Sequence, residues 1–439
     1  MSDWREIYQR RQTTPAGAAA LVQSGDIVQM PILTPLPKRI ADALAARAGD
    51  LANVTIRRNF ETDLMAWHDP ANQASFRTDS GFLSPLIRPA YLDHRLEFTV
   101  YSLSGLPRVT GPDVNRLMHP DVVIIQVSPP DENGFCSFGD QLWYSRSWCQ
   151  NARAVLAEVN PKLIRTYGQN YLHVSDVTAF VAQDESPGPL SASRAVPAED
   201  QAIAEAIGRF TADLIRDGDC IQLGFGLLAG AISVYLEDKH DLGVHSEVIP
   251  AGVAHLLKAG AVTGRRKTVR PGRIVGTSVM FNPEDLHLAH LNPQIELWEA
   301  GFTNDPKVAA QNPGFTAINN ALAVDLQGQV ASESFGWAMY SGMGGLIDFT
   351  MGAFLSPGGR TIYVLPATAK RGAVTRIVPE HPAGQIISVS RTFVDYVVTE
   401  FGVAHLTGKT ERQRANEMIN IAHPDYQGEL KKVARERWG

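Results

Sequence analysis

The sequence predicts an α/β fold with two tandem, similar open α/β domains, each built on a mainly parallel sheet. The chain has 439 residues, which is more than one hydrophobic core usually organises. Short apolar, β-rich runs alternate with helical stretches along the chain, as is typical of parallel sheets covered by helices. A polar, proline-rich stretch at 183–198 separates two halves of similar size, and we expect it to contain a linker.

The first domain is expected at residues 1–185, followed by a linker at 186–199. Its helical stretch at Pro37–Arg47 is rich in alanine. The runs expected to form strands are rich in valine and isoleucine, which suits strands buried on both faces. These runs are Asp26–Met30, Val54–Ile56, Phe98–Tyr101 and Asp121–Val127.

The second domain is expected at residues 200–439. It opens with a helix at Asp200–Phe210 and continues the same alternation. Ser24–Met30 and Asp217–Leu223 are loosely similar to each other, and each follows a helical stretch, which hints at a duplicated half. Further strands are expected at Arg273–Gly276, Arg360–Pro366 and Tyr396–Thr399.

Composition excludes several classes of protein. Hydrophobic residues make up 44% of the chain and charged residues 20%, as in a folded globular protein. The net charge of −6, without a long basic run, argues against nucleic acid or an anionic membrane as a partner. No apolar segment reaches membrane-spanning length, and the first residues lack the apolar core of a signal peptide. The three cysteines form no CxxC pair, so we expect a cytoplasmic protein without a disulfide framework.

A glycine turn follows the apolar run that begins at Ile221. Gly224 and Gly226 allow close approach of a bulky ligand to the backbone, and a helix that starts after them would offer its N-terminus to a phosphate. Gly230 completes a pattern close to a dinucleotide fingerprint, although it stands one place late for GxGxxG. A turn that only packs a helix on a strand is the other interpretation.

Glu247 lies within the apolar, glycine-bounded stretch Gly243–Gly252 and is expected at a strand end, where open α/β sheets bind ligands. In the dinucleotide interpretation it would be the ribose-binding acid, and otherwise it would be a surface carboxylate. His245 and His255 lie nearby, but their spacing fits no zinc-binding pattern, so no metal is expected.

A second glycine cluster, Ser341–Phe349, could line a groove with backbone N–H groups as an anion cradle, or could be a tight turn. Lys370 follows an expected strand and could neutralise a phosphate, although a lone loop lysine is often just solvated. Cys136 lies in a loop, where a merely buried thiol is favoured over a nucleophile. No GxSxG motif indicates a serine hydrolase.

Taken together, these segments resemble the acetyl-CoA hydrolase/transferase family, within the class I CoA-transferases, and the resemblance runs nearly end to end. It implies a CoA-transferase-like fold. The segments that carry it are Asp121–Gly139, Ala157–Pro161, Ile221–Gly226, Asp241–Glu247, Asn304–Pro306, Ala309–Pro313, Ala323–Val330, Ser341–Gly345, Phe401–Lys409 and Ile421–Asp425.

The resemblance implies that Glu247 is the catalytic carboxylate. It also implies that coenzyme A is a substrate and covalent intermediate, with no permanently bound cofactor. With an ordinary pKa of about 4.3, Glu247 would be ionised at pH 7 and would need no base. The residues implied to contact coenzyme A are Gly224, Phe225, Gly226, Leu227, Leu228, Gly342, Gly344, Gly345 and Lys370.

The sequence departs from the family pattern near the expected site. Leu227–Gly230 stands where isoleucine-proline is common, and Leu346 replaces a glutamine. Val248–Gly252 replaces the usual residues after the catalytic glutamate. We expect these departures to affect the choice of acyl substrate more than the type of reaction.

The implied function is transfer of coenzyme A between an acyl-CoA and a short carboxylic acid by a ping-pong mechanism through a glutamyl-CoA thioester. Acetate, butyrate, 4-hydroxybutyrate, succinate and itaconate are the acids that the family suggests. Arg57 and Arg58, at a strand end, could bind a second carboxylate of a dicarboxylic acid, or could be solvated charges. Alternatives are an acyl-CoA hydrolase that uses the same glutamate, a silent CoA-binding protein and an NAD(P)-dependent dehydrogenase. A homodimer or larger homo-oligomer is expected from base rates.

Overall fold

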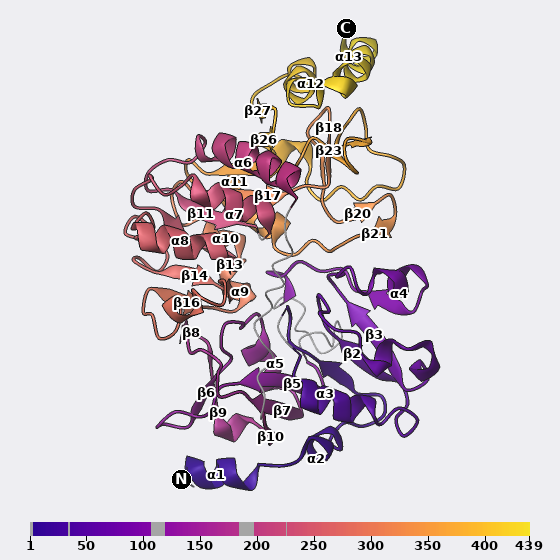
Figure 1. The fold of residues 1–439 in the computed structure, drawn as a ribbon, viewed down its shortest axis with the longest axis vertical. Helices are drawn as coiled ribbons and strands as arrows, with labels where there is room; N and C mark the ends of the chain where they lie inside the picture. The colour runs from indigo at the N-terminus through magenta and orange to yellow at the C-terminus, as the bar shows by residue number, and fades with distance from the viewer. Residues whose placement is uncertain (1–2, 34–35, 107–118, 184–196, 225) are drawn as a thin grey trace. The chain divides into compact units, whose positions relative to one another are not determined.

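The fold is known from a computed structural model that describes residues 3–33, 36–106, 119–183, 197–224 and 226–439 (Figure 1). The chain divides into two compact units. The first contains residues 1–192 and 286–301, and the second contains residues 193–285 and 302–439. Most of the predicted linker, 186–199, lies outside the described residues, and its last two residues begin helix α6 (Ala198–Ala212). The predicted domain boundaries stay a prediction. Segment 286–301, which the sequence placed in the second domain, clusters with the first unit.

The first unit is built on a seven-stranded parallel sheet with the strand order β10-β7-β5-β1-β2-β3-β4. The chain runs from β1 outward to β4 and then crosses to β5, so the order reverses between β1 and β5. The strands are β1 (Ile27–Gln29), β2 (Val54–Arg57), β3 (Phe76–Ser80), β4 (Leu96–Phe98), β5 (Val122–Val127), β7 (Ala154–Val159) and β10 (Ala179–Ala182).

One helix of this unit buries a clear apolar face. In α3 (Lys38–Ala45), Ile40, Ala41, Leu44 and Ala45 are buried at the spacing of one helix face and join the core around β1 and β2. The other helices are α1 (Trp4–Arg10), α2 (Pro15–Ala19), α4 (Arg88–Leu92) and α5 (Ser145–Asn151). The smaller strands of this unit are β6 (Phe135–Ser137), β8 (Tyr167–Gly168), β9 (Tyr171–His173) and β16 (Ile295–Leu297).

One predicted strand of this unit is wrong in its position. A strand was expected at Phe98–Tyr101, but β4 ends at Phe98. β4 is the edge strand, and after Thr99 donates to the carbonyl of Ser80 the chain leaves the sheet. The Tyr101 hydroxyl instead accepts a hydrogen bond from the side chain of Asn59.

The second unit is built on a six-stranded sheet with the order β12-β11-β17-β22-β26-β27, parallel except for the hairpin β26–β27. The prediction of an α/β fold with mainly parallel sheets is therefore confirmed. The strands are β11 (Cys220–Leu223), β12 (Gly243–Val244), β17 (Thr316–Asn320), β22 (Arg360–Val364), β26 (Tyr396–Thr399) and β27 (Gly402–His405).

Helices and short strands complete this unit. α6 packs on α7, α7 packs on α8, and α10 packs on α11. The helices are α7 (Leu227–Val234), α8 (Ala251–Ala259), α10 (Pro306–Ala309), α11 (Leu346–Leu355), α12 (Glu411–Asn420) and α13 (Pro424–Trp438), and the short α9 covers Ala300–Thr303. The small strands are β13 (Val248–Pro250), β14 (Ile274–Gly276), β15 (Ser278–Met280), β18 (Ala323–Asp325), β19 (Val330–Ala331), β20 (Ser334–Phe335), β21 (Ala338–Met339), β23 (Thr368–Ala369), β24 (Val374–Thr375) and β25 (Ile377–Val378).

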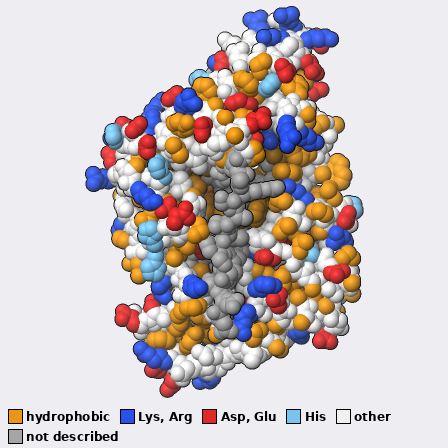
Figure 2. All heavy atoms as spheres, in the orientation of Figure 1, with side chains coloured by type: hydrophobic (Ala, Val, Ile, Leu, Met, Phe, Trp, Pro, Cys, Tyr) orange, Lys and Arg blue, Asp and Glu red, His pale blue; other side chains and the backbone are white. Residues whose placement is uncertain are grey.

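On the face shown in Figure 2, acidic and basic side chains are interspersed among hydrophobic ones. Such mixing matches the modest net charge of −6. No helix within the described ranges is long and apolar enough to cross a membrane.

Candidate active site

Glu247 lies in the second unit, between β12 and β13. Its backbone carbonyl accepts hydrogen bonds from the backbone N–H of Thr277 at 2.8 Å, the hydroxyl of Thr277 at 2.6 Å and the backbone N–H of Ser278 at 3.2 Å. Three donors on one carbonyl fix the backbone from which the carboxylate projects. The position at a strand end that the sequence predicted is therefore present.

Two hydrogen-bond donors hold the Glu247 carboxylate. The side-chain Nδ2 of Asn304 donates to Oε2 at 2.7 Å, and the backbone N–H of Gly345 donates to the same carboxylate. Gly345 is the N-cap residue of α11, so the carboxylate sits at the positive end of that helix. Asp348, in the first turn of α11, carries a like charge and therefore disfavours the ionised form of Glu247.

Burial raises the pKa of Glu247 to about 7, and the nearby Asp348 raises it as well, while the bonds from Asn304 and Gly345 lower it. The expectation of an ordinary pKa near 4.3 is therefore wrong. Partial removal from water disfavours the charged form, which a short sequence motif does not reveal. At pH 7 the carboxyl group is about half ionised.

The first glycine turn adjoins Glu247 through Ser246. The hydroxyl of Ser246, which is fully buried, donates to the carbonyl of Leu223 at 3.0 Å and accepts from its N–H at 3.3 Å. Gly224 follows directly, and Gly226 is the N-cap residue of α7 with a left-handed φ of 105°. Leu227 and Leu228 form the first turn of α7, and Leu227 is exposed. Phe225 lies outside the described residues.

The second glycine cluster lies directly against Glu247. A Cβ atom on Gly345 would lie 2.5 Å from Nδ2 of Asn304 and closer still to Oε2 of Glu247. Gly344 has a left-handed φ of 56°, which favours glycine. Gly342 is buried just before them. The sequence left an anion cradle and a tight turn as alternatives for this cluster, and in this structure the cluster lies against the Glu247 carboxylate.

Lys370 is exposed in the turn between β23 and β24, where its φ of 52° is left-handed. Among the described residues, no recorded hydrogen bond or ion pair joins it to Glu247 or to the glycine turns. Its contact with a phosphate stays a prediction.

Asn304 and His245 have roles that the sequence reasoning missed. Nε2 of the fully buried His245 lies 2.7 Å from the carbonyl of Thr303, the residue before Asn304. Burial lowers the pKa of His245 to about 3, so the ring is neutral and donates its Nε2–H to that carbonyl. Asp305 caps α10 and fixes the chain just after Asn304. Asn304 and Glu247 are 57 residues apart, and only the fold brings them together.

Other polar groups singled out in the sequence have structural surroundings. His255 pairs with Glu237 at 2.9 Å rather than with His245. Burial raises the pKa of Cys136 to about 12, so its thiol is not activated. Within the part of the chain that the structure describes, no group of three or more histidine, cysteine or acidic side chains could hold a metal ion.

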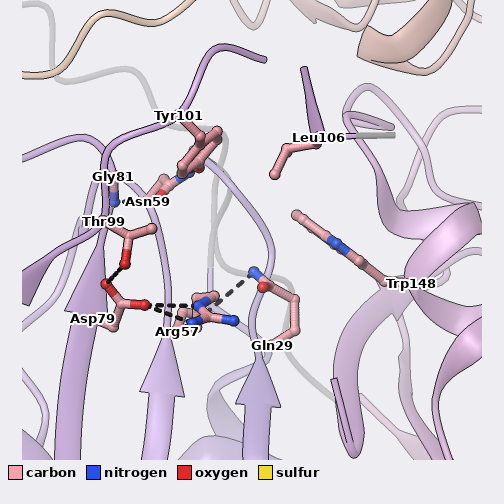
Figure 3. A pocket seen from close by; sticks show the side chains of 9 residues that line it. All are labelled: Gln29, Arg57, Asn59, Asp79, Gly81, Thr99, Tyr101, Leu106 and Trp148. Atoms are coloured by element: carbon pink, nitrogen blue, oxygen red, sulfur yellow. Dashed lines mark hydrogen bonds and ion pairs between the residues drawn. The ribbon is translucent and has the colours of Figure 1, made fainter. Parts of the chain in front are cut away.

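Arg58 is buried, and Arg57 is partly buried, with 14% of its side chain exposed. Arg57 pairs with Asp79 (Figure 3), and Nη2 of Arg58 donates to the hydroxyl of Thr62 at 2.9 Å. The interpretation of these two residues as solvated charges is therefore wrong. The charge of Arg57 is already balanced by Asp79, which weakens its interpretation as a carboxylate-binding residue.

Replacing Asn304 with alanine is expected to lower turnover of a CoA ester at pH 7 by about 10- to 100-fold. The change removes a bond that positions the carboxylate and that lowers the pKa of Glu247. Part of the loss should therefore be recovered at pH 9, where the carboxyl group ionises despite the change. Rates at the two pH values check this, with Asn151→Ala as the control because its side chain donates only to the carbonyl of Ser147. An equal loss at both pH values would contradict the effect on the pKa.

Comparison with known proteins identifies the family of this chain. Residues 1–191 match the acetyl-CoA hydrolase/transferase N-terminal domain, and residues 284–434 match the C-terminal domain. The 4-hydroxybutyrate coenzyme A transferase of Clostridium kluyveri is 36% identical over 99% of this chain and 100% of its own. Butyryl-CoA:acetate CoA-transferase of Anaerostipes caccae is 32% identical over 99% of this chain and 98% of its own.

A solved structure shares the fold along its whole length. RipA from Yersinia pestis is 32% identical, covers 99% of both chains and superposes with a TM-score of 0.89. The two domain matches, the full-length relatives and the shared fold lead to one conclusion: the chain belongs to the acetyl-CoA hydrolase/transferase family.

Proposed function

We propose that the protein is a CoA-transferase that moves coenzyme A between an acyl-CoA and a short carboxylic acid, with Glu247 as the covalent carrier. The observation that carries this proposal is the Glu247 carboxylate, held by Asn304 and Gly345 at the N-terminus of α11. A carboxylate that is oriented and partly removed from water is suited to attack a thioester. Acetate, butyrate, 4-hydroxybutyrate, succinate and itaconate are the acids to test.

The reaction has four steps. The Glu247 carboxylate attacks the acyl-CoA carbonyl, and the C–S bond breaks to give an acyl-glutamyl anhydride and CoA thiolate. The thiolate attacks the glutamyl carbonyl, which releases the first acid and leaves a glutamyl-CoA thioester. The second acid attacks this thioester through its carboxylate, and the C–S bond breaks to give a new acyl-glutamyl anhydride and CoA thiolate. The thiolate then attacks the acyl carbonyl of this anhydride, and the C–O bond to Glu247 breaks. The products are the second acyl-CoA and free Glu247.

Positioning must supply much of the rate because a carboxylate is a weak nucleophile. A well-oriented group can remove about 7–11 kcal/mol of barrier. A backbone N–H group that holds the oxyanion contributes about 3–4 kcal/mol. We assign these donor roles to the turns at Gly224–Leu228 and Gly342–Gly345, and contact with the CoA phosphates to Lys370.

The rate of CoA transfer is expected to rise with pH around a midpoint near 7. Only ionised Glu247 attacks the thioester, and its pKa of about 7 means that the reactive fraction grows across pH 6 to 8. The measurement is kcat/KM for an acyl-CoA from pH 5 to 9, corrected for uncatalysed hydrolysis. A profile already flat at pH 5.5 would indicate a pKa that is not raised.

Mass spectrometry tests the proposed function directly. The protein is incubated with acetyl-CoA, butyryl-CoA or succinyl-CoA without an acid acceptor, and the peptides are analysed. A CoA adduct on the Glu247 peptide that an added carboxylate discharges would support the transferase. An adduct that water alone discharges equally fast would favour the hydrolase, and CoA binding without any adduct would favour the silent CoA-binding protein.

We also propose a cytoplasmic homo-oligomer, the compartment from the cysteine pattern and the oligomer from the general frequency of symmetric homo-oligomers. The three cysteines are all free and buried. Light scattering after size-exclusion chromatography measures the mass in solution, and a monomer at all concentrations would contradict the oligomer.

A further inference from the structure

Two hydrogen bonds join the segment that carries Glu247 to Thr303 and Asn304 of the same unit. One is the bond from Asn304 to the Glu247 carboxylate at 2.7 Å. The other lies two residues earlier, where Nε2 of His245 is 2.7 Å from the backbone carbonyl of Thr303. Alternate residues of an extended chain point to the same side, so His245 and Glu247 face the same neighbouring segment. The His245 bond therefore holds the residue that precedes Asn304.

The ring of His245 is enclosed and makes one recorded hydrogen bond within the described ranges. It is fully buried, and its centroid lies 6.4 Å from that of Phe302 and 6.2 Å from that of Phe315. A carbonyl oxygen only accepts, so Nε2 carries the proton and donates it to Thr303. The other ring nitrogen, Nδ1, is buried without a hydrogen-bond partner among the described residues. The ring therefore has the form and the surroundings of a fixed donor.

The orientation of the Asn304 side chain depends on the position of its backbone. Its Nδ2 donates to Glu247, whereas its Oδ1 is buried and has no hydrogen-bond partner among the residues described. The amide therefore has one recorded anchor, and the place of the backbone decides whether Nδ2 reaches the carboxylate. Asp305 caps α10 and holds the chain on one side of Asn304. The bond from His245 to Thr303 holds it on the other side.

We propose that His245 is a positioning residue for the transfer reaction, because its bond to the Thr303 carbonyl sets Asn304 where the amide orients the Glu247 carboxylate. The inference rests on the proposed CoA-transferase function. The ring nitrogen that carries the proton points to a backbone carbonyl, so His245 has no part in the covalent steps. Removal of the Nε2–H should therefore act on Glu247 only through Asn304.

Substitutions of His245 separate the two ring nitrogens. His245→Gln places its amide nitrogen near the position of Nε2, from which it can still donate to Thr303. His245→Asn is one methylene shorter and ends near the position of Nδ1, so it cannot reach that carbonyl. Both variants bury an amide in the same space, so a general effect of the substitution should be alike in both. His245→Phe is a second variant without the donor, and it keeps a ring between Phe302 and Phe315.

The expected kinetic effect is on turnover rather than on binding of the acyl-CoA. His245→Asn and His245→Phe should lower kcat about tenfold at pH 7, while KM for the acyl-CoA stays within about twofold. The midpoint of kcat/KM against pH should rise by about half a unit or more, because the bond from Asn304 favours ionised Glu247. His245→Gln should recover most of kcat and the wild-type midpoint. Equal losses in His245→Gln and His245→Asn would overturn the inference.

A double-mutant cycle tests whether the effect passes through Asn304. In the Asn304→Ala background, His245→Asn should cost less than about twofold in kcat, because the amide that His245 positions is already absent. A further tenfold loss would mean that His245 acts by another route, which would also overturn the inference. His381→Phe is the matched control. Nε2 of His381 donates to the carbonyl of Gln329 at 2.9 Å in the same unit, and its loss should leave kcat and the midpoint unchanged.

The pKa of Glu247 gives a measurement that needs no turnover. Carbon NMR of protein with isotope-labelled glutamate carboxyl groups follows it, and the signal is identified by its absence from Glu247→Gln. This pKa should rise in His245→Asn and return in His245→Gln. Such a rise without CoA transfer by the wild type would support the positioning role and refute the proposed function. Transfer by the wild type with an unchanged pKa in His245→Asn and His245→Phe would overturn the positioning role and leave the proposed function standing.

Discussion

Replacing Glu247 with glutamine is expected to lower CoA transfer by at least about 10³-fold. The amide has nearly the same shape but cannot form the anhydride, so the covalent route is lost. Glu247→Ala should be equally inactive. Glu247→Asp keeps the carboxylate but withdraws it by one methylene from Asn304 and Gly345, and should lose about 10²-fold through misplacement.

The measurement is acceptor-dependent CoA transfer by purified protein. Glu237→Gln is the matched control, because Glu237 is an exposed glutamate of the same unit that pairs with His255. Turnover close to wild type in Glu247→Gln would refute the proposed role of this residue.

The same Glu247→Gln variant has a predicted effect on stability. In the folded protein the pKa of Glu247 is about 7, compared with 4.5 for an ordinary glutamate. The stability contributed by this carboxyl group is therefore fully present below pH 4.5 and is lost as the pH rises through 7. Glutamine never ionises, so the variant should be more stable than wild type at pH 8. The expected difference in the free energy of unfolding is about 1–2 kcal/mol, because the partial exposure of the side chain reduces the effect of the pKa shift. Chemical unfolding at pH 8 and pH 5 checks this, and the difference should shrink at pH 5.

Replacing Gly345 with alanine is the second change with a large expected effect. The new methyl group would overlap Oε2 of Glu247 and the side chain of Asn304, and would lie 2.8 Å from the ring of Phe349. The carboxylate must then move away from the N-terminus of α11, and we expect a loss of at least about 10²-fold in kcat. Steady-state kinetics with a saturating acyl-CoA measure it.

Gly428→Ala is the control for that experiment. Gly428 lies inside α13, and a Cβ atom there meets nothing within 4 Å. This change should keep full activity and add up to about 1 kcal/mol of stability through helix propensity. Full activity of Gly345→Ala would show that the carboxylate does not need its present position.

The sequence predicted those parts of the fold and site that depend on neighbouring residues. β1, β5 and β22 coincide with apolar runs, and Glu247 lies at a strand end as expected. The spacing of the glycines in the turn at Gly224 fitted a dinucleotide fingerprint almost as well as it fitted a CoA-binding turn. Local spacing could not choose between them, and family membership favours the CoA interpretation.

Contacts between distant residues were not predictable. Asn304 and Gly345 reach Glu247 across 57 and 98 positions of the chain, through α10 and α11, and no periodicity connects them. The raised pKa of Glu247 follows from that burial and was missed for the same reason. The strand expected at Phe98–Tyr101 was wrong for another reason. β4 is an edge strand, and it ends where its neighbour β3 stops offering backbone hydrogen-bond partners.

The two donors to the Glu247 carboxylate, Nδ2 of Asn304 and the backbone N–H of Gly345, belong to the same compact unit as Glu247. The contacts that orient the carboxylate are therefore contained in one unit of the chain. Substitutions confined to the first unit change neither of these donors, so that unit can vary in sequence while the carboxylate keeps both of them.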